Sequence, residues 1–326
     1  MPTRLPSRVH SAFAVAFLLT SGAAAAQDYP VRPIRLVVPY GPGGSTDTVA
    51  RILGARIADS IGQQVIIDNR GGAASIPGTE IAAKAAPDGY TMLLANIALA
   101  ANPNLFKKLP YDTERDLSPV GLVSTMPTVL IVHPSIPARS IKQLIVLAKA
   151  RPGELNYASV GYGSINHLTT EVFKASTGTD IVQILYKGAG PAFVDLIGGR
   201  VSMMFATIVA AYPHVEAGRL IALGVSSSKR NSILPNVPTV AEAGVPGFDV
   251  KEWQLLVVPA RTPAFVIERL NAELSKALQV PEARERIIGL GADPVGSTPT
   301  EGAHLLKAEL ARWARTVKEA RIQVID

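Results

Sequence analysis

The sequence predicts an α/β protein with two similar units, each built on a parallel sheet with helices on its faces. Short β-branched runs alternate with stretches of helical periodicity from Ile34 onward, and the same alternation starts again after Pro134. The chain has 326 residues, which is more than one hydrophobic core usually holds. Its composition, with 48% hydrophobic and 18% charged residues, is that of a globular protein rather than a disordered one.

The first unit has the order β-α-β-α-β. Buried strands are predicted at Ile34–Pro39, Gln63–Asn69 and Thr91–Asn96. Between the first two strands, five aliphatic residues fall on one face of a helix: Val49, Ile52, Leu53, Ile57 and Ile61. An order of strand, helix and strand with short connections produces parallel strands, so this unit is expected to be a parallel sheet.

The second unit repeats the pattern and is followed by a helical C-terminal third. Its strands are predicted at Asn156–Ser159, Ile181–Tyr186, Val201–Phe205 and Leu220–Ser227. Thr298 and Glu301 form a capping box that opens a helix with Trp313 on its packed face. Trp253 precedes an apolar run that we interpret as a strand returning to the first unit, so we expect Trp253 near the hinge and at the edge of a cleft.

The first 26 residues have the pattern of a secretory signal peptide. Arg4 and Arg8 give a positive start, residues 11–22 are apolar, and Ala23–Ala26 supply the small residues of a cleavage site. The apolar stretch is shorter than the roughly 20 residues that a spanning helix needs. We therefore expect an exported chain whose mature form begins near Gln27. The chain contains no cysteine and so no disulfide, which suits a bacterial periplasmic protein with a large core.

The charge and glycine patterns argue against nucleic acid and nucleotide ligands. The formal net charge is +6, but the Lys and Arg residues form no long basic run and are not interleaved with aromatic residues. No segment matches G-x-x-x-x-G-K-[ST], and no glycine-rich loop completes G-x-G-x-x-G. We interpret the basic residues as solvated surface.

Four glycine-rich or small-residue loops follow predicted strands. They are Tyr40–Asp47, Asp68–Gly78, Ser159–Ser164 and Tyr186–Pro191. In parallel sheets such loops lie at the carboxyl ends of the strands, where ligands bind. Glycine lets the backbone approach a ligand, and the start of the next helix presents unpaired N–H groups with partial positive charge. Each loop alone could be an ordinary tight turn, but together they predict an anion site between the units, which a carboxylate fits.

The alternative of a secreted serine hydrolase depends on two residues. His167 lies one turn after Ser164, which permits a Ser–His pair. However, there is no G-x-S-x-G elbow, no orienting acid at a readable position and no histidine pair with metal-ligand spacing. We favour His167 as a support for its loop and Asp47 as a capping carboxylate. We expect no catalytic residue, no metal and no cofactor.

Several long segments resemble the Bug-type (TctC-like) periplasmic receptors of tripartite tricarboxylate transporters. They are residues 29–47, 82–96, 156–173, 186–205, 234–248 and 269–274. The resemblance implies a type II periplasmic-binding-protein fold, with two Rossmann-like α/β domains around a hinge and an interdomain cleft. It also implies capture of a small organic carboxylate without catalysis, for uptake through inner-membrane transporter subunits. The loops Tyr40–Asp47 and Gly161–Ser164 would hold the ligand carboxylate, partly through ordered water.

This resemblance also implies the domains and the site. Residues 1–26 would be the signal peptide, residues 27–125 and 253–326 domain 1, and residues 126–252 domain 2. The expected ligand-binding residues come from the loops, the third strand of domain 2 and the hinge: Tyr40, Gly41, Gly43, Gly44, Ser45, Asp47, Ala73, Ala74, Ser75, Gly161, Gly163, Ser164, Lys187, Gly188, Ala206 and Trp253. We expect a monomer. The effector domain of a LysR-like regulator has a similar shape, but it would follow a helix-turn-helix, where this chain has an export signal.

Three departures from the family pattern concern the ligand. Residues 72–75 read Gly-Ala-Ala-Ser where relatives read near Gly-Ala-Gly-Gly, Ala206 stands where many carry Asp, and residues 253–255 read Trp-Gln-Leu where relatives often read W-x-G. The lack of an acid at position 206 argues against a ligand with an ammonium group. We therefore expect an aromatic carboxylate or a di- or tricarboxylate without an amino group.

Overall fold

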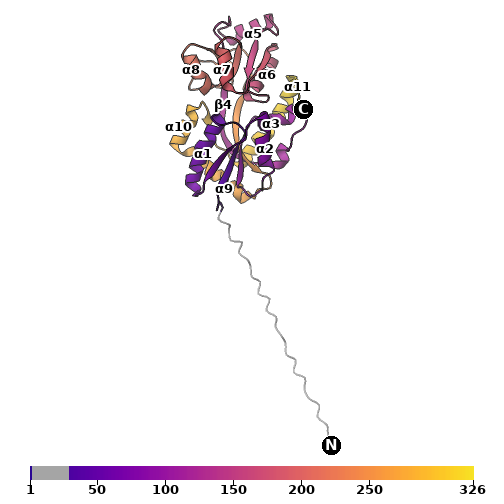
Figure 1. Cartoon of the computed structure of the whole chain (residues 1–326), viewed down its shortest axis with the longest axis vertical. Coiled ribbons are helices and arrows are strands. Elements are labelled where there is room, and N and C mark those ends of the chain that lie inside the picture. The colour runs from indigo at the N-terminus through magenta and orange to yellow at the C-terminus, as the bar shows by residue number, and fades with distance from the viewer. Residues whose placement is uncertain (2–28) are drawn as a thin grey trace.

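The computed structural model describes residue 1 and residues 29–326 of the chain (Figure 1). The predicted signal peptide and its cleavage site therefore lie outside the described residues. The described chain forms two lobes, one above the other in the view of Figure 1. The early and late parts of the chain make the lower lobe, and its middle part makes the upper lobe.

A connected set of strands runs through both lobes. The strands are β1 (Ile34–Val38), β2 (Val65–Asn69), β3 (Thr91–Asn96), β4 (Leu117–Val132), β5 (Asn156–Ser159), β6 (Val182–Leu185), β7 (Met203–Thr207), β8 (Ile221–Val225), β9 (Lys251–Pro259) and β10 (Asp293–Pro294). Their order is β2-β1-β3-β9-β4-β7-β5-β6, and β8 and β10 each pair with β4. The strands predicted from the sequence are confirmed, with small shifts at their ends.

The outer parts of this sheet are parallel, and its centre is antiparallel. β1 pairs in parallel with β2 and β3, and β5 pairs in parallel with β6 and β7. The central pairs β3–β9, β9–β4 and β4–β7 are antiparallel. Two parallel units are thus joined by antiparallel strands, which confirms the predicted two-unit α/β organisation.

β4 is the strand that passes from one lobe to the other. Its first part, Leu117–Pro127, pairs with β9, and its last part, Thr128–Val132, pairs with β7 and β8. We call the strands β1, β2, β3, β9, β10 and the first part of β4 the first lobe, and the remaining strands the second lobe. The domain limits predicted at 125/126 and 252/253 fall inside β4 and β9, and the domain division itself stays a prediction.

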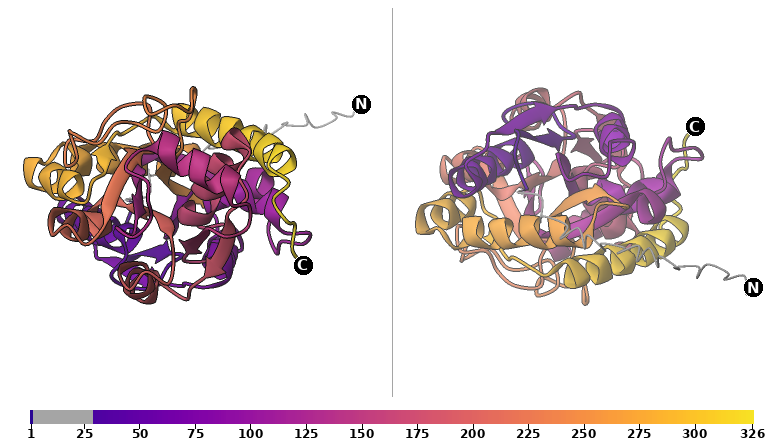
Figure 2. Two further views of the ribbon diagram at one scale, coloured as in Figure 1. Left: turned by 90° about the horizontal axis from the view of Figure 1, so that it is seen from above. Right: turned by 90° about the horizontal axis from the view of Figure 1, so that it is seen from below.

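Helices cover both lobes. They are α1 (Ser45–Ile61), α2 (Ile76–Ala83), α3 (Ala98–Leu105), α4 (Thr113–Asp116), α5 (Ile141–Ala150), α6 (Ile165–Thr177), α7 (Ala189–Ile197), α8 (Ile208–Glu216), α9 (Ala264–Gln279), α10 (Pro281–Gly289) and α11 (Pro299–Glu319), with a short 3₁₀ turn η1 (Ala73–Ser75). α5 to α8 lie in the upper lobe of Figure 1, and α1, α2, α3 and α9 lie in the lower. The end-on views show the C-terminal helices running along one side of the molecule (Figure 2).

Local signals explain the boundaries of α1 and the start of α11. α1 follows Gly44 and stops at Gly62, whose left-handed φ of +67° suits glycine and lets its N–H donate to the Ala58 carbonyl. α11 starts with the predicted capping box, in which Thr298 and Glu301 each satisfy the other's backbone N–H. Trp313 on this helix is fully buried, as predicted.

Among the residues that the structure describes, no helix combines the length and the apolar character required to cross a membrane.

Candidate functional site

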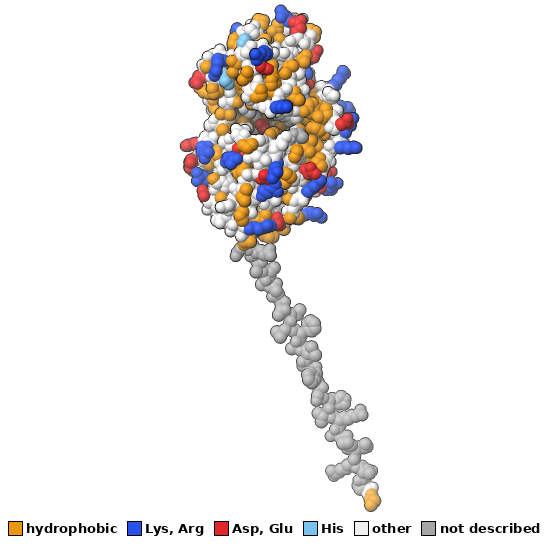
Figure 3. Space-filling view, in the orientation of Figure 1, with side chains coloured by type: hydrophobic (Ala, Val, Ile, Leu, Met, Phe, Trp, Pro, Cys, Tyr) orange, Lys and Arg blue, Asp and Glu red, His pale blue; other side chains and the backbone are white. Residues whose placement is uncertain are grey.

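A cavity of about 210 Å³ lies between the two lobes. Figure 3 shows that the surface is hollowed between the upper and the lower lobe. The first lobe contributes Tyr40, Gly44, Ser45, Thr46, Asn96 and Glu252 to its lining. The second lobe contributes Val160, Ser164, Ile165, Asn166, Ala189, Phe193, Met204, Ala206, Thr207 and Ala210. The first lobe thus presents mainly polar groups, and the second lobe presents mainly apolar ones.

The loop between β1 and α1 is shaped by Asp47. This side chain is buried, and its Oδ2 accepts hydrogen bonds from the Gly43 N–H at 2.9 Å and from Arg51 Nε at 3.0 Å. Its Oδ1 accepts from Asn69 Nδ2 at 2.9 Å. Burial alone would raise the pKa of Asp47, but these three donors outweigh it and leave the pKa below its usual value. The expectation that Asp47 is a capping carboxylate of its own loop is confirmed.

The loop between β5 and α6 is shaped by neutral groups. Gly161 and Gly163 have left-handed φ values of +138° and +71°. His167 is buried, and its Nδ1 accepts from the Gly163 N–H at 3.2 Å. Burial lowers the pKa of His167 to about 4, so the imidazole is neutral and able to accept this bond. The prediction that His167 supports the loop is confirmed.

The geometry of Ser164 does not favour a hydrolase. Its hydroxyl donates to the Gly161 carbonyl at 2.6 Å and accepts weakly from the His167 backbone N–H at 3.4 Å. The imidazole Nδ1 is occupied by Gly163 instead. Ser164 therefore acts as the N-cap of α6, and its hydroxyl is not activated by a base.

Together the two loops bring two helix starts to one cavity. Gly44 is the N-cap of α1 and Ser164 is the N-cap of α6, and both line the cavity with the first residues that follow them. Helix starts present unpaired N–H groups and a partial positive charge. None of the described residues that line the cavity is Lys, Arg or His. The arrangement can therefore bind an anion through backbone N–H groups and hydroxyls.

Glu252 is the one carboxyl in this lining, and the sequence analysis missed it. The side chain is buried, with 5% exposure, and its Oε1 accepts from Asn96 Nδ2 at 2.6 Å. The same Asn96 nitrogen is 2.6 Å from the Tyr40 hydroxyl. Burial raises the pKa of Glu252 to about 7, against a smaller lowering by Asn96. Burial and the nearby Glu252 also raise the pKa of Tyr40, so its phenol remains protonated.

Five of the sixteen predicted site residues line the cavity directly. They are Tyr40, Gly44, Ser45, Ser164 and Ala206. Gly41, Gly43, Asp47, Gly161 and Gly163 belong to the same two loops but are not part of the lining. Lys187 is exposed, and Gly188 is the N-cap of α7, one residue before the lining residue Ala189. The role of these residues in ligand binding stays a prediction.

The turn η1, which contains Ala73, Ala74 and Ser75, supports the cavity from outside. Ala74 and Ser75 have left-handed φ values of +54° and +68°, which are strained for residues with a Cβ. The Ala74 carbonyl accepts from Asn102 Nδ2 at 2.8 Å, and Ser75 hydrogen-bonds with the Tyr40 hydroxyl. Side chains at these two positions thus occupy a turn whose backbone favours glycine.

The expected position of Trp253 is corrected by the structure. Trp253 is buried, its Nε1 donates to Glu309 Oε2 at 3.0 Å, and Trp313 Nε1 donates to the same oxygen at 3.2 Å. It is not part of the cavity lining. Successive side chains of a strand point to opposite faces of the sheet. Since Glu252 faces the cavity, the next residue of β9 faces α11 instead.

Most other cavity residues that the sequence analysis missed are apolar residues or lie at the ends of strands and helices, where no motif marks them. Asn96 ends β3 and Thr207 ends β7, so their position at the carboxyl end of a strand was a usable signal. Thr46 and Asn166 lie in the first turns of α1 and α6. No group of three or more His, Cys, Asp or Glu side chains within residue 1 and residues 29–326 could hold a metal ion.

Comparison of the sequence with known proteins gives consistent matches along the chain. Residues 49–322 match the family described as "Tripartite tricarboxylate transporter family receptor" (TctC). Protein BugT of Bordetella pertussis is 42% identical over 308 residues, covering 93% of this chain and 94% of that protein. A UPF0065 protein from the tcbD-tcbE intergenic region of Pseudomonas sp. strain P51 is 40% identical over 317 residues, covering 97% and 94%.

Solved structures share the fold. Rpa4515 of R. palustris, solved with adipate, has a TM-score of 0.84 and 36% identity and covers 91% of this chain and 100% of its own. MatC (Rpa3494) from Rhodopseudomonas palustris, solved with bound malate, has a TM-score of 0.81 and 34% identity, covering 89% and 100%. The periplasmic binding protein BugD has a TM-score of 0.82 and 32% identity, covering 91% and 100%. These similarities confirm the predicted periplasmic-binding-protein fold.

Proposed function

Since this chain belongs to the family of receptors of tripartite tricarboxylate transporters, we propose that it captures a small organic carboxylate between its lobes and passes it to the membrane subunits of such a transporter. Receptors of this family are periplasmic binding proteins and not enzymes. The proposed sequence of events is entry of the ligand into the open cleft, closure about the hinge strands β4 and β9, and release at the membrane.

One observation carries this proposal: the starts of α1 and α6 meet at one cavity whose lining contains no cationic side chain among the described residues. Two sets of helix N–H groups and the Ser45 and Thr46 hydroxyls suit the oxygens of a carboxylate. A typical micromolar affinity corresponds to about −8 kcal/mol, which a few charge-assisted hydrogen bonds and apolar burial can supply.

The second lobe suggests which carboxylates fit. Its wall is formed by aliphatic and aromatic side chains, among them Val160, Phe193 and Met204, and Ala206 adds no charged group to it. Such a wall suits the carbon skeleton of an aromatic carboxylate or of a di- or tricarboxylate without an amino group. The structures of relatives with adipate and malate are consistent with this class.

Export and assembly are also part of the proposal. The positive start, the apolar stretch and the alanine-rich cleavage site of residues 1–26 support export to the periplasm with removal of the signal peptide near Gln27. We propose a monomer in which residues 27–125 and 253–326 form one domain and residues 126–252 the other. An intact mass that still includes residues 1–22 in periplasmic material would contradict the export proposal.

The test is to identify the ligand directly and then to compare its binding with that of analogues whose carboxylate is replaced by an amide or a methyl ester. Mass spectrometry of small molecules released on denaturation, followed by a thermal-shift panel of carboxylates, amides and methyl esters, separates the possibilities. At 100 times Kd, ligand binding adds about 2.7 kcal/mol to the free energy of unfolding. That corresponds to a rise in Tm of about 5–11 °C for 150–250 residues, with the lower end expected for this longer chain. Equal shifts from an acid and its amide would contradict the proposal.

A further inference from the structure

Glu252 presents a chemical problem for a receptor of anions. The other described residues of the lining are uncharged, so the only ionisable acid in the cavity would repel an incoming carboxylate if it were ionised. Its surroundings offer no compensation. Met126 is its neighbour on β4, Asn96 is its contact from β3, and Tyr40 is the titratable group that packs against it.

The other elements around the cavity provide no cationic side chain to compensate an ionised Glu252. The start of α1 contributes Gly44, Ser45 and Thr46, and α6 contributes Ser164, Ile165 and Asn166. Val160 in the loop before α6 is apolar, and β7, α7 and α8 contribute side chains that are apolar or hydroxylic. The helix starts carry a partial positive charge, but the ligand carboxylate competes for it. Lys251, the preceding residue of β9, forms an ion pair with Asp249 at 3.6 Å.

The hydrogen-bond network determines which Glu252 oxygen can carry a proton. Asn96 Oδ1 accepts from the Ala98 N–H at 3.1 Å, which orients the amide so that its nitrogen faces Tyr40 and Glu252. That nitrogen donates to the Tyr40 hydroxyl and to Glu252 Oε1, which uses both of its hydrogens. Oε1 is therefore an acceptor. Oε2 has no hydrogen-bond partner among residues 29–326, so a proton on Oε2 would be available to a ligand in the cavity.

We propose that Glu252 is the specificity-determining residue of the cavity: it binds the ligand in its protonated form, donates from Oε2 to a ligand oxygen, and so couples carboxylate capture to the uptake of one proton. The proton comes from the solvent and stays on Glu252 while the ligand is bound. A ligand oxygen is preferred over a ligand ammonium group, because a protonated carboxyl has no charge to offer a cation. This inference rests on the proposed function and names its ligand class more closely.

The proton-coupled site predicts a specific pH dependence. Burial places the pKa of Glu252 at about 7 in the free protein, and an anion beside it raises that pKa further. Below pH 7 the carboxyl is already protonated, and affinity is constant. Above pH 7 a proton must be taken up, and Kd rises up to about tenfold per pH unit. Tyr40 does not titrate in this range, because burial raises its pKa.

The experiment is isothermal titration calorimetry of the mature protein at pH 6.0 and 8.0, in buffers of different ionisation enthalpy. The probes are succinate, malate, adipate, benzoate, terephthalate and 2-aminoadipate. For the tightest binder we expect close to one proton taken up at pH 8.0 and close to none at pH 6.0. We expect 2-aminoadipate to bind more weakly than adipate.

Two variants separate a specific role from a structural one. Glu252→Gln keeps an acceptor for Asn96 and a permanent donor toward the ligand, so it should bind within about threefold of the parent at pH 6.0 and take up no proton at pH 8.0. Glu309→Gln changes another buried glutamate of the first lobe, which lies outside the cavity lining, and should leave the proton uptake unchanged. Thermal melts of both variants verify folding.

The outcomes distinguish the two proposals. Binding of carboxylates without proton uptake at pH 8.0, or uptake that persists in Glu252→Gln, overturns the inference and leaves the carboxylate receptor in place. Tighter binding of 2-aminoadipate than of adipate, lost in Glu252→Gln, overturns it in favour of an ionised Glu252 that pairs with ammonium. Failure of every carboxylate probe to bind counts against the proposed function and the inference together.

Discussion

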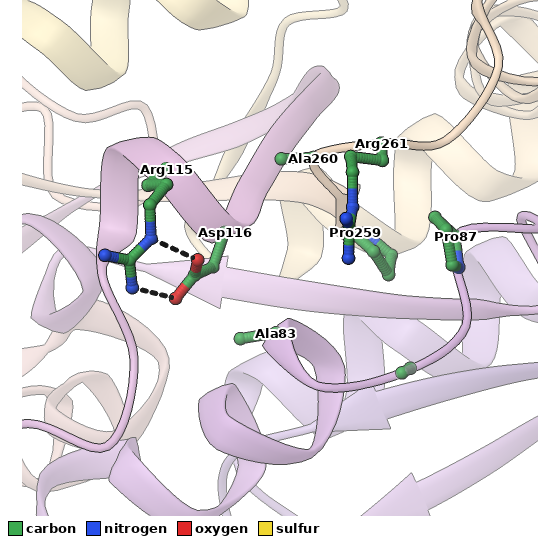
Figure 4. A pocket seen from close by; sticks show the side chains of 8 residues that line it. Ala83, Pro87, Arg115, Asp116, Pro259, Ala260 and Arg261 are labelled. Atoms are coloured by element: carbon green, nitrogen blue, oxygen red, sulfur yellow. Dashed lines mark hydrogen bonds and ion pairs between the residues drawn. The ribbon is translucent and has the colours of Figure 1, made fainter.

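The cavity between the lobes and a pocket on the surface of the first lobe offer an anion opposite environments. The surface pocket, about 310 Å³, is lined by Ala83, Ala85, Pro87, Arg115, Asp116, Pro259, Ala260 and Arg261 (Figure 4). It contains two guanidinium groups, whereas the lining of the cavity between the lobes contains none. A count of charges would therefore place an anionic ligand in the surface pocket.

The geometry instead favours binding of the anion in the cavity between the lobes. Arg115 donates to both oxygens of Asp116, at 2.9 and 3.2 Å, and both arginines are exposed, so water and an internal partner compete with a ligand. At the cavity, the buried side chains of Asp47 and His167 hold the two loops that lead into α1 and α6 before the ligand arrives. We therefore expect anion recognition in this protein to depend on pre-organised N–H groups away from water rather than on positive side chains.

The largest expected effect is at Gly163. A Cβ at this position would lie 3.3 Å from Asn102 Oδ1 and 3.3 Å from Leu105 Cδ1 of the first lobe, and φ is +71°. We expect Gly163→Val to weaken ligand binding by at least about 100-fold, or ~2.7 kcal/mol, because the lobes could no longer approach. Gly153→Val is the matched control: φ is +75°, but only Asp180 Oδ2 lies near, at 3.6 Å. A calorimetric Kd within twofold of the parent for Gly163→Val would refute this role.

Asp47→Ala should have the next largest effect. The change leaves the Gly43 N–H, Arg51 and Asn69 without their buried acceptor. We expect a loss of about 2–4 kcal/mol in the free energy of unfolding and at least about a tenfold rise in Kd, since the first loop loses its shape. Asp68→Ala also removes a carboxylate paired with arginines, but outside this loop, and should affect stability without the loss of affinity. The idea fails if both variants bind alike.

The pH dependence of stability gives a third test, with opposite signs at two buried residues, His167 and Glu252. Between pH 4 and 6.5 the unfolded chain protonates His167 while the native imidazole stays neutral, so the free energy of unfolding decreases as pH falls. Between pH 4.5 and 7 the native Glu252 keeps a proton that the unfolded chain releases, so the same quantity decreases as pH rises. The two contributions oppose each other from pH 4.5 to 6.5.

Replacing either Glu252 or His167 should therefore reveal the contribution of the other residue to the pH dependence of the free energy of unfolding. Relative to the parent, Glu252→Gln should lose stability as pH falls from 6.5 to 4.5, and His167→Asn, which keeps an acceptor for Gly163, should lose stability as pH rises over that window. Each slope is at most about 1.4 kcal/mol per pH unit. Urea unfolding at four pH values measures this. Parallel pH curves for the parent and both variants would show that neither group has the pKa shift described.

A smaller and favourable change is expected at Ala74. Its φ of +54° is strained for alanine, and glycine adopts it without cost. We expect Ala74→Gly to raise the free energy of unfolding by about 0.5–1 kcal/mol after the larger chain entropy of glycine is counted. Ala303→Gly, in an exposed position of α11, should lower it by about 1 kcal/mol. Destabilisation by Ala74→Gly would mean that the methyl group contributes packing that outweighs the strain.

The smallest effect is expected in the surface pocket. The double variant Arg115→Ala/Arg261→Ala should leave Kd within twofold of the parent, because these guanidinium groups lie outside the cavity. A tenfold loss of affinity in this variant would reverse the comparison between the two regions.

The sequence predicted features that depend on interactions between residues close together in the chain, and it missed features that depend on distant residues. The alternation of strands and helices, the capping box of Thr298 and the loop supports Asp47 and His167 were predictable, because spacing within a few residues determines them. Glu252 was missed and Trp253 was assigned to the wrong face, because the orientation of β9 depends on its pairing with β3 and β4, more than 100 residues away in the chain. A period-of-two reading of β9 together with the buried Trp313 could have shown that Trp253 faces the core.

A crystal structure of the mature protein with its co-purified or identified ligand would show directly which groups hold the carboxylate. We expect a carboxylate between the lobes, with its oxygens about 2.7–3.2 Å from backbone N–H groups at the starts of α1 and α6 or from a water that bridges them, and no Lys or Arg side chain in contact. A ligand carboxylate held by Arg115 or Arg261 in the surface pocket, or one that avoids both helix starts, would contradict it.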